Sequence, residues 1–249
     1  MKALRIAARL TGLIGLLLGS LALHGAWRLL RLPSPWPRRF LGAAAWICGA
    51  RVRVRGCPPR ASSLILSNHC GWLDILVLGG ATGAAFVARG DLQGVPLIGR
   101  LCRTNRTLFV DRADRRAIHD QVAQLRGALA EGPVVVFPEG TTSDGVVLLP
   151  FKPALLSALD PAPPGICVQP VFLDYGTAAP EVAWAEDKGE NGIENALGIL
   201  GRRGTVPVTI DFLEPFDPAV VGDRKAIAAE VRHRITAALR AAGSRIRVA

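Results

Sequence analysis

The sequence predicts an α/β fold in which a mixed sheet is flanked by helices. Two short apolar runs, Leu64–Leu66 and Val134–Phe137, have the length and composition of buried strands. Each run leads into a polar, glycine-containing block, the first over Asn68–Asp74 and the second over Phe137–Ser143. Because reactive groups gather outside the carboxyl ends of strands in such sheets, we expect the two blocks to meet in one crevice.

The chain begins with an apolar segment long enough to cross a bilayer. No charged residue lies between Arg9 and Arg28, and a helix over Leu10–Trp27 would be about 27 Å long. Lys2 and Arg5 precede it as in a signal peptide, but no convincing small-residue cleavage site follows. We therefore expect an uncleaved membrane segment. Cations flank it on both sides, so charge does not indicate its orientation.

A second apolar stretch, Phe40–Ile47, is too short to span a membrane. It suits either an interfacial helix anchored by Trp36 and Trp46 or an ordinary core helix, and both interpretations stay open. The predicted domain organisation is a pair of N-terminal membrane-attachment helices over residues 1–50, followed by the domain that carries the two polar blocks over residues 51–249.

Further strands and helices alternate through this second domain. Arg51–Arg55 alternates with period two and predicts an edge strand with a basic outer face. Gly90–Arg106 contains three glycines and a proline and predicts broken helix or loop. Apolar residues at helical spacing predict helices over Asp114–Glu131 and Arg224–Leu239. Glu181–Leu200 has no clear pattern. Four other predicted strands cover Phe86–Ala88, Thr107–Val110, Ile166–Leu173 and Val206–Phe212.

The composition limits the partners of this chain. Half of the residues are hydrophobic and the net charge is +10, which suits an anionic membrane face, an acidic substrate such as a CoA or carrier protein, or nucleic acid. No nucleic-acid-binding motif is present, so that class is set aside. The five cysteines form no C-x-x-C pair, which favours a reducing compartment, and the histidines show no metal-ligand spacing, so we expect no metal.

His69 and Asp74 in the first block have the chemistry of a general base and its orienting partner. If His69 lies in the turn after the strand and Asp74 in the next helix, the carboxylate can fold back to accept the imidazole N–H. No serine or cysteine is clearly placed as a nucleophile, since Cys70 is adjacent to His69 and their side chains would diverge. The pair therefore favours direct activation of a substrate hydroxyl. A helix-capping or core histidine is the alternative.

Four ordered blocks between Leu64 and Phe172 resemble the glycerolipid acyltransferase family, which includes the lysophosphatidate acyltransferases. His69 with Asp74 is similar to the catalytic His-x4-Asp block of that family. The other three similar blocks are Thr107–Arg112, Phe137–Thr141 and Val168–Val171. The resemblance implies the glycerol-3-phosphate acyltransferase-like fold. It also implies that the histidine takes a proton from an acceptor hydroxyl, which then attacks an acyl thioester.

The resemblance also implies roles for individual residues. His69 would be the base and Asp74 its partner, and backbone N–H groups near the following helix are candidate donors to the thioester oxyanion. Gly140 and Thr141 would shape the turn that presents Glu139. We expect the substrate-binding residues to be Asn68, Arg112, Glu139, Gly140, Thr141 and Thr142. Membrane lipids and acyl-CoA or acyl-carrier protein are the expected partners, with no separate cofactor.

One position departs from the family pattern. The third block commonly continues with arginine, which can meet an acceptor phosphate, whereas this chain has Thr142. We expect 1-acyl-sn-glycerol-3-phosphate as the acceptor and phosphatidic acid as the product, with Arg112, Arg106, Arg103 or Lys152 able to supply the charge. The run Thr141–Gly145 also resembles enzymes that acylate lyso-ornithine lipid, whose head group carries no phosphate.

Two more distant alternatives remain. A lipid-binding protein without turnover would not need the intact His-Asp pair, and a lipid hydrolase would need a Gly-x-Ser-x-Gly elbow that the chain lacks. The arginine-rich, lysine-poor composition suggests a bacterium. We therefore expect the protein at the inner membrane, with its catalytic domain facing the cytoplasm. Acyl chain length, choice of acyl donor and oligomeric state do not follow from the sequence.

Overall fold

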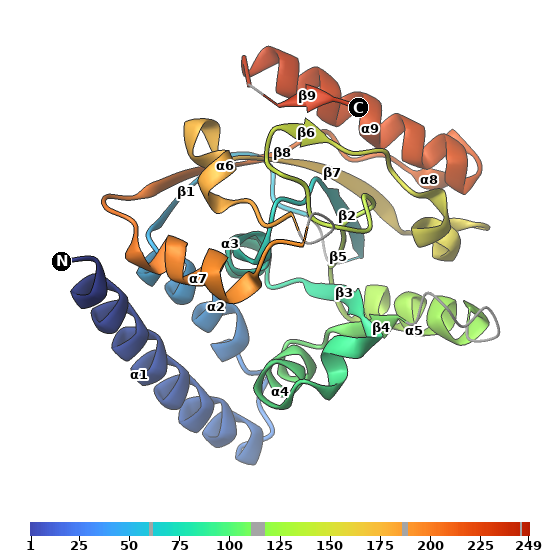
Figure 1. Ribbon diagram of the computed structural model, residues 1–249. Coiled ribbons are helices and arrows are strands. Elements are labelled where there is room, and N and C mark those ends of the chain that lie inside the picture. Colours follow the sequence, from blue (N-terminus) through green and yellow to red (C-terminus); the bar gives the residue numbers. More distant parts are fainter. Residues whose placement is uncertain (60–61, 111–117, 186–188, 245) are drawn as a thin grey trace.

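The computed structural model describes residues 1–59, 62–110, 118–185, 189–244 and 246–249. A seven-stranded sheet forms its centre, in the order β1-β8-β7-β2-β5-β3-β4 (Figure 1). Its strands are β1 (Ala50–Gly56), β2 (Ser63–Ser67), β3 (Ala85–Arg89), β4 (Leu108–Val110), β5 (Val134–Val136), β7 (Cys167–Asp174) and β8 (Val206–Phe212). Neighbouring strands run parallel except β7 and β8, which are antiparallel. The predicted mixed sheet is therefore confirmed, and β1 is an edge strand.

Helices cover both faces of the sheet (Figure 1). They are α1 (Lys2–Leu29), α2 (Trp36–Ile47), α3 (Trp72–Thr82), α4 (Pro96–Thr104), α5 (Ile118–Glu131), α6 (Ala179–Val182), α7 (Gly192–Gly201), α8 (Pro218–Val221) and α9 (Arg224–Ala241). Three short 3-10 helices are η1 (Gly90–Gly94), η2 (Pro153–Leu159) and η3 (Gly176–Ala178), and β6 (Val147–Leu148) pairs with β9 (Arg247–Val248).

The strands are apolar on both faces because two cores lie against them. Leu64 and Leu66 of β2 pack into the core formed with α5, η2 and α9, whereas Ile65 points into the core formed with α2, α3 and α7. Side chains of a strand alternate between the two faces of a sheet, so an unbroken apolar run is what a sheet covered on both sides requires. This arrangement explains why the runs before the two polar blocks show no polar alternation.

The N-terminal helices pack against the flank of the domain (Figure 1). Arg5 donates to the carbonyl of Gly201 at 3.0 Å, and Arg9 donates to Ile199 and Leu200 at 2.9 and 3.1 Å, so both cations bind the C-terminal carbonyls of α7. Cations are favourable at this end of a helix. Of all α1 residues, only Ser20 is buried. By length and composition, α1 is the one described helix that could cross a membrane.

α2 has one packed face and one open face. Its Leu41, Ala44 and Ala45 are buried, whereas Trp46 is 63% exposed. The packed face meets α3 so closely that a Cβ on Gly80 would lie 2.5 Å from the Cα of Gly42. α2 is thus packed as a core helix is, and its open face remains available for an interface. The predicted boundary after residue 50 falls just inside β1, whose first residue is Ala50, and the independence of the two segments remains a prediction.

Most other expected elements are confirmed with small shifts of their ends. Gly90–Arg106 is broken into η1 and α4, and α5 ends at Glu131, while its expected cap, Asp114, lies outside the described residues. The unassigned region after Glu181 contains α7, which is capped by the side chain of Asn191 accepting from the amide of Ile193 at 2.9 Å.

Candidate functional site

The site lies where three neighbouring strands end. β2 pairs in parallel with both β5 and β7, with Leu66 opposite Val136 on one side and Ser67 opposite Val171 on the other. The segments after the three strands therefore leave the sheet at the same edge. The expected meeting of the two polar blocks is confirmed, and the end of β7 joins them.

His69 lies in the turn after β2, and Asp74 lies in the first turn of α3, as the spacing predicts. The imidazole Nδ1 and the Asp74 Oδ2 are 2.7 Å apart. The imidazole also stacks on the ring of Phe137, with centroids 3.8 Å apart and planes 10° from parallel. The His69 side chain is 15% exposed, and no partner for its Nε2 is found in the described part of the chain. One nitrogen is thus fixed by a carboxylate while the other faces outward.

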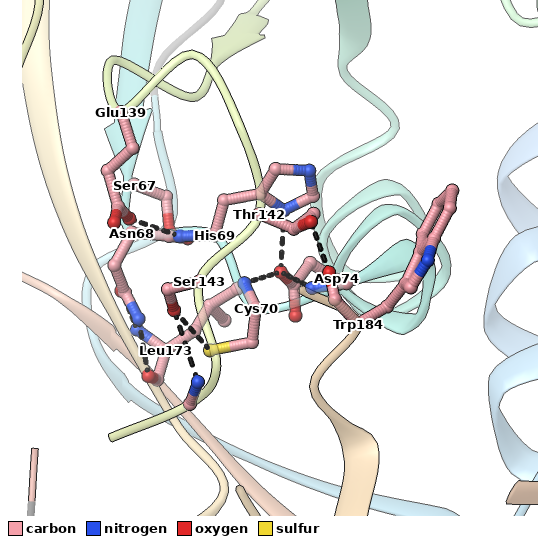
Figure 2. Close-up of polar contacts among 12 residues, drawn as sticks. Ser67, Asn68, His69, Cys70, Asp74, Glu139, Thr142, Ser143, Leu173 and Trp184 are labelled. Atoms are coloured by element: carbon pink, nitrogen blue, oxygen red, sulfur yellow. Dashed lines mark hydrogen bonds and ion pairs between the residues drawn. The ribbon is translucent and has the colours of Figure 1, made fainter. Parts of the chain in front are cut away.

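Asp74 is fully buried and surrounded by donors. Besides the imidazole, its Oδ2 accepts the backbone N–H of Cys70 at 2.6 Å and of Gly71 at 3.0 Å (Figure 2). Its Oδ1 accepts the hydroxyl of Tyr175 at 2.5 Å. The backbone N–H groups of Cys70 and Gly71, which lie near the start of α3, therefore donate to Asp74. The same turn brings the carboxylate to His69 and directs these two amides toward the carboxylate. That other backbone N–H groups near the start of α3 serve an oxyanion stays a prediction.

The third block holds the His69 peptide from both sides. Glu139 Oε1 accepts the N–H of His69 at 2.7 Å, and the N–H of Ser143 donates to the His69 carbonyl at 2.8 Å (Figure 2). Glu139 Oε2 accepts the N–H of Leu149 at 2.9 Å. Burial raises the pKa of Glu139 to about 8, partly opposed by the amides of His69 and Leu149.

This geometry differs from the expected substrate contact of Glu139. The side chain is 1% exposed and both carboxylate oxygens are bound to backbone amides. The buried carboxylate therefore joins the first block to the third and fixes the position of His69, since buried polar groups are stabilised only when their hydrogen bonds are made.

Asn68 is also a positioning residue in this structure, not an exposed substrate contact. It is 3% exposed, its Nδ2 donates to the carbonyl of Leu173 at 3.0 Å, and its Oδ1 accepts the Leu173 N–H at 2.8 Å (Figure 2). The amide side chain thus continues the pairing of β2 with β7 beyond the end of the strand, because it offers the same donor and acceptor as a peptide group.

Gly140 and Thr141 form the turn after Glu139, as expected. Gly140 has φ of +73°, a left-handed conformation that disfavours any residue with a Cβ. A Cβ there would also lie 3.1 Å from the Lys152 Cδ, so the lysine side chain lies across the turn. Thr141 is partly exposed. Lys152 is therefore a cation placed beside the third block.

Thr142 is buried, and its hydroxyl donates to the backbone carbonyl of Trp184 (Figure 2). The N–H of Trp184 donates in turn to the Cys70 carbonyl at 2.8 Å. The hydroxyl expected to face substrate is thus bound to the segment between α6 and α7, which also binds the turn that carries His69. Because no helix or strand was predicted over Glu181–Leu200, the sequence could not reveal Trp184 as part of the site.

The candidate cations lie in different places. Arg112 lies outside the described residues. Arg106 donates to the carbonyl of Gly83 at 3.4 Å and lies 3.7 Å from a carboxylate oxygen of Glu131. These contacts lie at the C-terminal ends of α3 and α5, whereas His69 lies before the N-terminus of α3. Arg103 donates to the Gln93 carbonyl at 3.5 Å. Of the described candidates, Lys152 is the cation found beside the third block.

Two residues to which the sequence analysis gave no role belong to the site: Phe137, which stacks on the imidazole, and Tyr175, which binds Asp74. Tyr175 is the sole tyrosine of the chain and follows the predicted strand Ile166–Leu173 by two residues, so its place at a third strand end was the available signal. Among the residues that the structure describes, no group of three or more His, Cys, Asp or Glu side chains could hold a metal ion.

The arrangement defines a class of site: an imidazole whose Nδ1 is held by a buried carboxylate at the carboxyl edge of a mixed α/β sheet. Such an imidazole can take a proton from a hydroxyl held at Nε2. Cys70, which follows His69 in the chain, is not an activated thiol, since burial and nearby carboxylates raise its pKa well above its ordinary value.

Comparison with known proteins identifies the family. The sequence model of the family described as Acyltransferase matches residues 51–174. A lyso-ornithine lipid O-acyltransferase of Rhizobium meliloti is 37% identical over 82% of this chain and 74% of its own, and one from Brucella abortus is 35% identical over 86% of both chains. A 1-acyl-sn-glycerol-3-phosphate acyltransferase of Neisseria gonorrhoeae is 30% identical over 70% and 68%.

The fold has a solved counterpart. The crystal structure of the 1-acyl-sn-glycerophosphate acyltransferase from Thermotoga maritima matches with a TM-score of 0.69 over 98% of both chains, at 21% identity. The chain belongs to the acyltransferase family, and it is an O-acyltransferase that acylates lysolipids. Bacterial relatives and the apolar α1 associate it with a membrane.

Proposed function

We propose that His69 is the general base of acyl transfer and that Asp74 orients it. The imidazole Nε2 takes the proton of the acceptor hydroxyl while the oxygen attacks the thioester carbonyl carbon of acyl-CoA or acyl-carrier protein. An O–C bond forms, the C–S bond breaks, and the proton passes to the departing thiolate. The observation that carries this proposal is the 2.7 Å contact between Nδ1 and the buried Asp74, which leaves Nε2 facing outward. The thioester is already activated, so this chemistry needs no resident cofactor or metal.

The acceptor that the site supports best is lyso-ornithine lipid. Thr142 stands where many family members carry a phosphate-binding arginine, and its hydroxyl is already bound to Trp184. A phosphate dianion needs a fixed cation or several donors, whereas a head group without phosphate does not. The relatives at 32–37% identity that are named lyso-ornithine lipid O-acyltransferases support the same acceptor.

Lysophosphatidic acid is the second candidate because of Lys152. Its side chain crosses Gly140, so an ammonium group lies beside the third block. A single flexible lysine can pair with phosphate as a point charge, without the two-pronged contact of arginine. The relative from Neisseria gonorrhoeae is named for this acceptor.

An apolar cavity supports a lipid substrate. It has a volume of about 290 Å³ and lies between α1, α2, α3 and α4. Leu21, Phe40, Ile75 and Leu101 line it, one from each helix. Trp72, the first residue of α3, lies in its wall, so the cavity extends to the end of the helix that carries Asp74. We assign it to an acyl chain, since burial of methylene groups is favourable by about 0.8 kcal/mol each.

For localisation, we propose the bacterial inner membrane with the catalytic domain on the cytoplasmic side, where CoA and carrier-protein thioesters are found. Arg5 and Arg9 bind the end of α7, and Leu21 near the other end of α1 lines the cavity with α4. The helix therefore runs along the domain. If α1 crossed the bilayer along the membrane normal, the flank of the catalytic domain that packs beside it would lie in the hydrocarbon core. We propose that α1 lies in one leaflet with its exposed apolar face among the lipids.

The test of the acceptor is a competition assay with purified protein in vesicles. Labelled acyl-CoA and acyl-carrier protein are each offered with equal amounts of lyso-ornithine lipid and lysophosphatidic acid. We expect the label mainly in ornithine lipid. Preference for lysophosphatidic acid would contradict the proposed acceptor and assign the phosphate to Lys152 or to an arginine of the second block. Transfer to neither would refute both acceptors.

A further inference from the structure

We infer that Tyr175 is a positioning residue of the catalytic base: its hydroxyl holds Asp74 in the one orientation that serves His69. The two side chains share a 2.5 Å hydrogen bond between the tyrosine hydroxyl and Oδ1. Both are buried, at 1% and 0% exposure. The inference rests on the proposed role of the His69–Asp74 pair.

The two oxygens of Asp74 have different surroundings. Oδ2 accepts from the imidazole and from the amides of Cys70 and Gly71, whereas Tyr175 is the donor found for Oδ1 among the described residues. A buried carboxylate with an oxygen left unpaired is costly, and it can recover a partner only by rotating or by taking a proton. Either change would weaken the bond that fixes the imidazole tautomer.

Tyr175 itself is held in place by its backbone and its ring. It follows β7 directly, its carbonyl accepts the N–H of Ala178 at 3.1 Å, and its ring packs in the same core as Cys70 and Leu73. Burial and the charge of Asp74 raise the pKa of the phenol well above its ordinary value, so the hydroxyl remains a donor over the working range of the enzyme. The tyrosine thus acts through Asp74 and not on the substrate.

This role predicts a change in pH dependence. The tyrosine donor withdraws charge from the carboxylate, so its removal strengthens the attraction between Asp74 and the imidazolium. The acid limb of the kcat profile should then move to higher pH. Other titratable or charged groups near the pair, among the described residues, are Cys70, whose pKa is well above its ordinary value, Glu139, whose pKa is about 8, and Asp174 and Arg232, whose charges act on Cys70 and Glu139. A packing variant that keeps all of these groups is therefore the control for the pH profile.

The kinetic test compares Tyr175→Phe, which deletes one oxygen and keeps the ring, with Phe172→Leu, a packing control in β7, the strand that Tyr175 follows. Phe172 is also 1% exposed but packs in the other core. We expect Tyr175→Phe to lower kcat about tenfold, with KM within about twofold and the acid limb displaced upward. Phe172→Leu should leave the pH profile in place. An unchanged kcat and profile in Tyr175→Phe, or the same displacement in both variants, would overturn the inference.

A second test does not depend on turnover or on the folding of Tyr175→Phe. Because the chain has one tyrosine, its ultraviolet resonance Raman doublet reports the Tyr175 hydroxyl alone. We expect a strong-donor signature in the wild type that weakens in Asp74→Asn. A weak-donor signature in the wild type would refute the contact. If the wild type transfers no acyl group to any lysolipid, the proposed function fails, while the Raman comparison still decides whether Tyr175 binds Asp74.

Discussion

His69 is fixed by contacts to four residues, one in the first turn of α3 and three in the block Phe137–Ser143. Asp74 binds its ring nitrogen, Phe137 lies against its ring face, and Glu139 and Ser143 bind the two ends of its peptide unit. The sequence predicted the pairing with Asp74, because a histidine in the turn after a strand and an aspartate in the first turn of the next helix are brought within hydrogen-bond distance. It could not predict that Asn68, Glu139 and Thr142 are buried, since burial depends on segments that arrive from far along the chain.

Asp74→Asn should lower kcat roughly 10³-fold. If the NH2 group of the new asparagine faces the N–H groups of Cys70 and Gly71, the hydrogen bonds that hold the turn are lost. If it faces the imidazole, the tautomer of His69 is no longer fixed. Steady-state transfer at saturating acceptor measures the effect, and a circular dichroism melt serves as the folding control. A variant that keeps its fold and most of its kcat would show that the carboxylate is not needed.

Thr142→Arg should raise the ratio of kcat/KM for lysophosphatidic acid over lyso-ornithine lipid by about tenfold, because it adds a cation where a phosphate can meet it. The matched control is Thr142→Val, which also removes the hydrogen bond to Trp184 but adds no charge. The same ratio in both variants would show that the charge at this position does not select the acceptor.

At the scale of elements, the site depends on the ends of β2, β5 and β7. Their apolar runs and the polar blocks after them were visible in the sequence, and the sheet order then brings the blocks together. The segment between α6 and α7 was not assigned, because the sequence from Glu181 to Leu200 carries no sustained apolar period. Its contact with the catalytic turn runs through the backbone of Trp184, which side-chain patterns do not report.

Glu139→Gln should destabilise the protein by about 1–3 kcal/mol. The NH2 group of the new glutamine cannot accept a hydrogen bond, so the backbone N–H of either His69 or Leu149 loses its acceptor. The native pKa of about 8 lies above the ordinary 4.5, so the folded state holds this proton more tightly than the unfolded state. The stabilisation from the protonated group is present below about pH 4.5 and is lost as the pH rises through about 8. The decrease in the free energy of unfolding caused by Glu139→Gln should therefore be greater at about pH 5 than at about pH 8.5. Urea unfolding measures it, and a difference independent of pH would contradict burial of a titrating Glu139.

Gly80→Ala tests the contact between α2 and α3. The new Cβ would lie 2.5 Å from Gly42, so the helices must separate, at a cost of about 1–3 kcal/mol. Gly198→Ala on α7 is the control, because a Cβ there meets nothing within 4 Å and should stabilise the helix by about 0.5–1 kcal/mol. Thermal unfolding of both variants measures the difference, and equal midpoints would show that the two helices are not in close contact.

At the scale of the whole molecule, α1 runs along one flank of the domain (Figure 1). Residues of α1 also line the apolar cavity that lies between it and α2, α3 and α4. The sequence predicted a membrane segment from its length and lack of charge. It could not predict that the helix folds back along the domain, because this depends on Arg5 and Arg9 reaching the end of α7. We propose that this flank faces the lipid and receives the acyl chain.

The double variant Ile14→Glu with Leu18→Glu should lower partitioning into anionic vesicles by about 100-fold or more. These side chains are 58% and 63% exposed, and each contributes about 1.5–3 kcal/mol when buried in lipid. Val220→Glu on α8 is the control, since Val220 is 85% exposed on another element. Vesicle co-sedimentation measures the partitioning. Equal binding by both variants would place the membrane contact elsewhere.

The most direct test of the account is the transfer rate of His69→Ala in lipid vesicles with lyso-ornithine lipid as acceptor. We expect kcat/KM to fall by about 10²–10⁴ relative to the wild type, with the circular dichroism spectrum and vesicle binding unchanged. This result would assign the proton transfer to the imidazole that Asp74 holds. Turnover within about tenfold of the wild type would contradict the mechanism, because the described site offers no second base in place of His69.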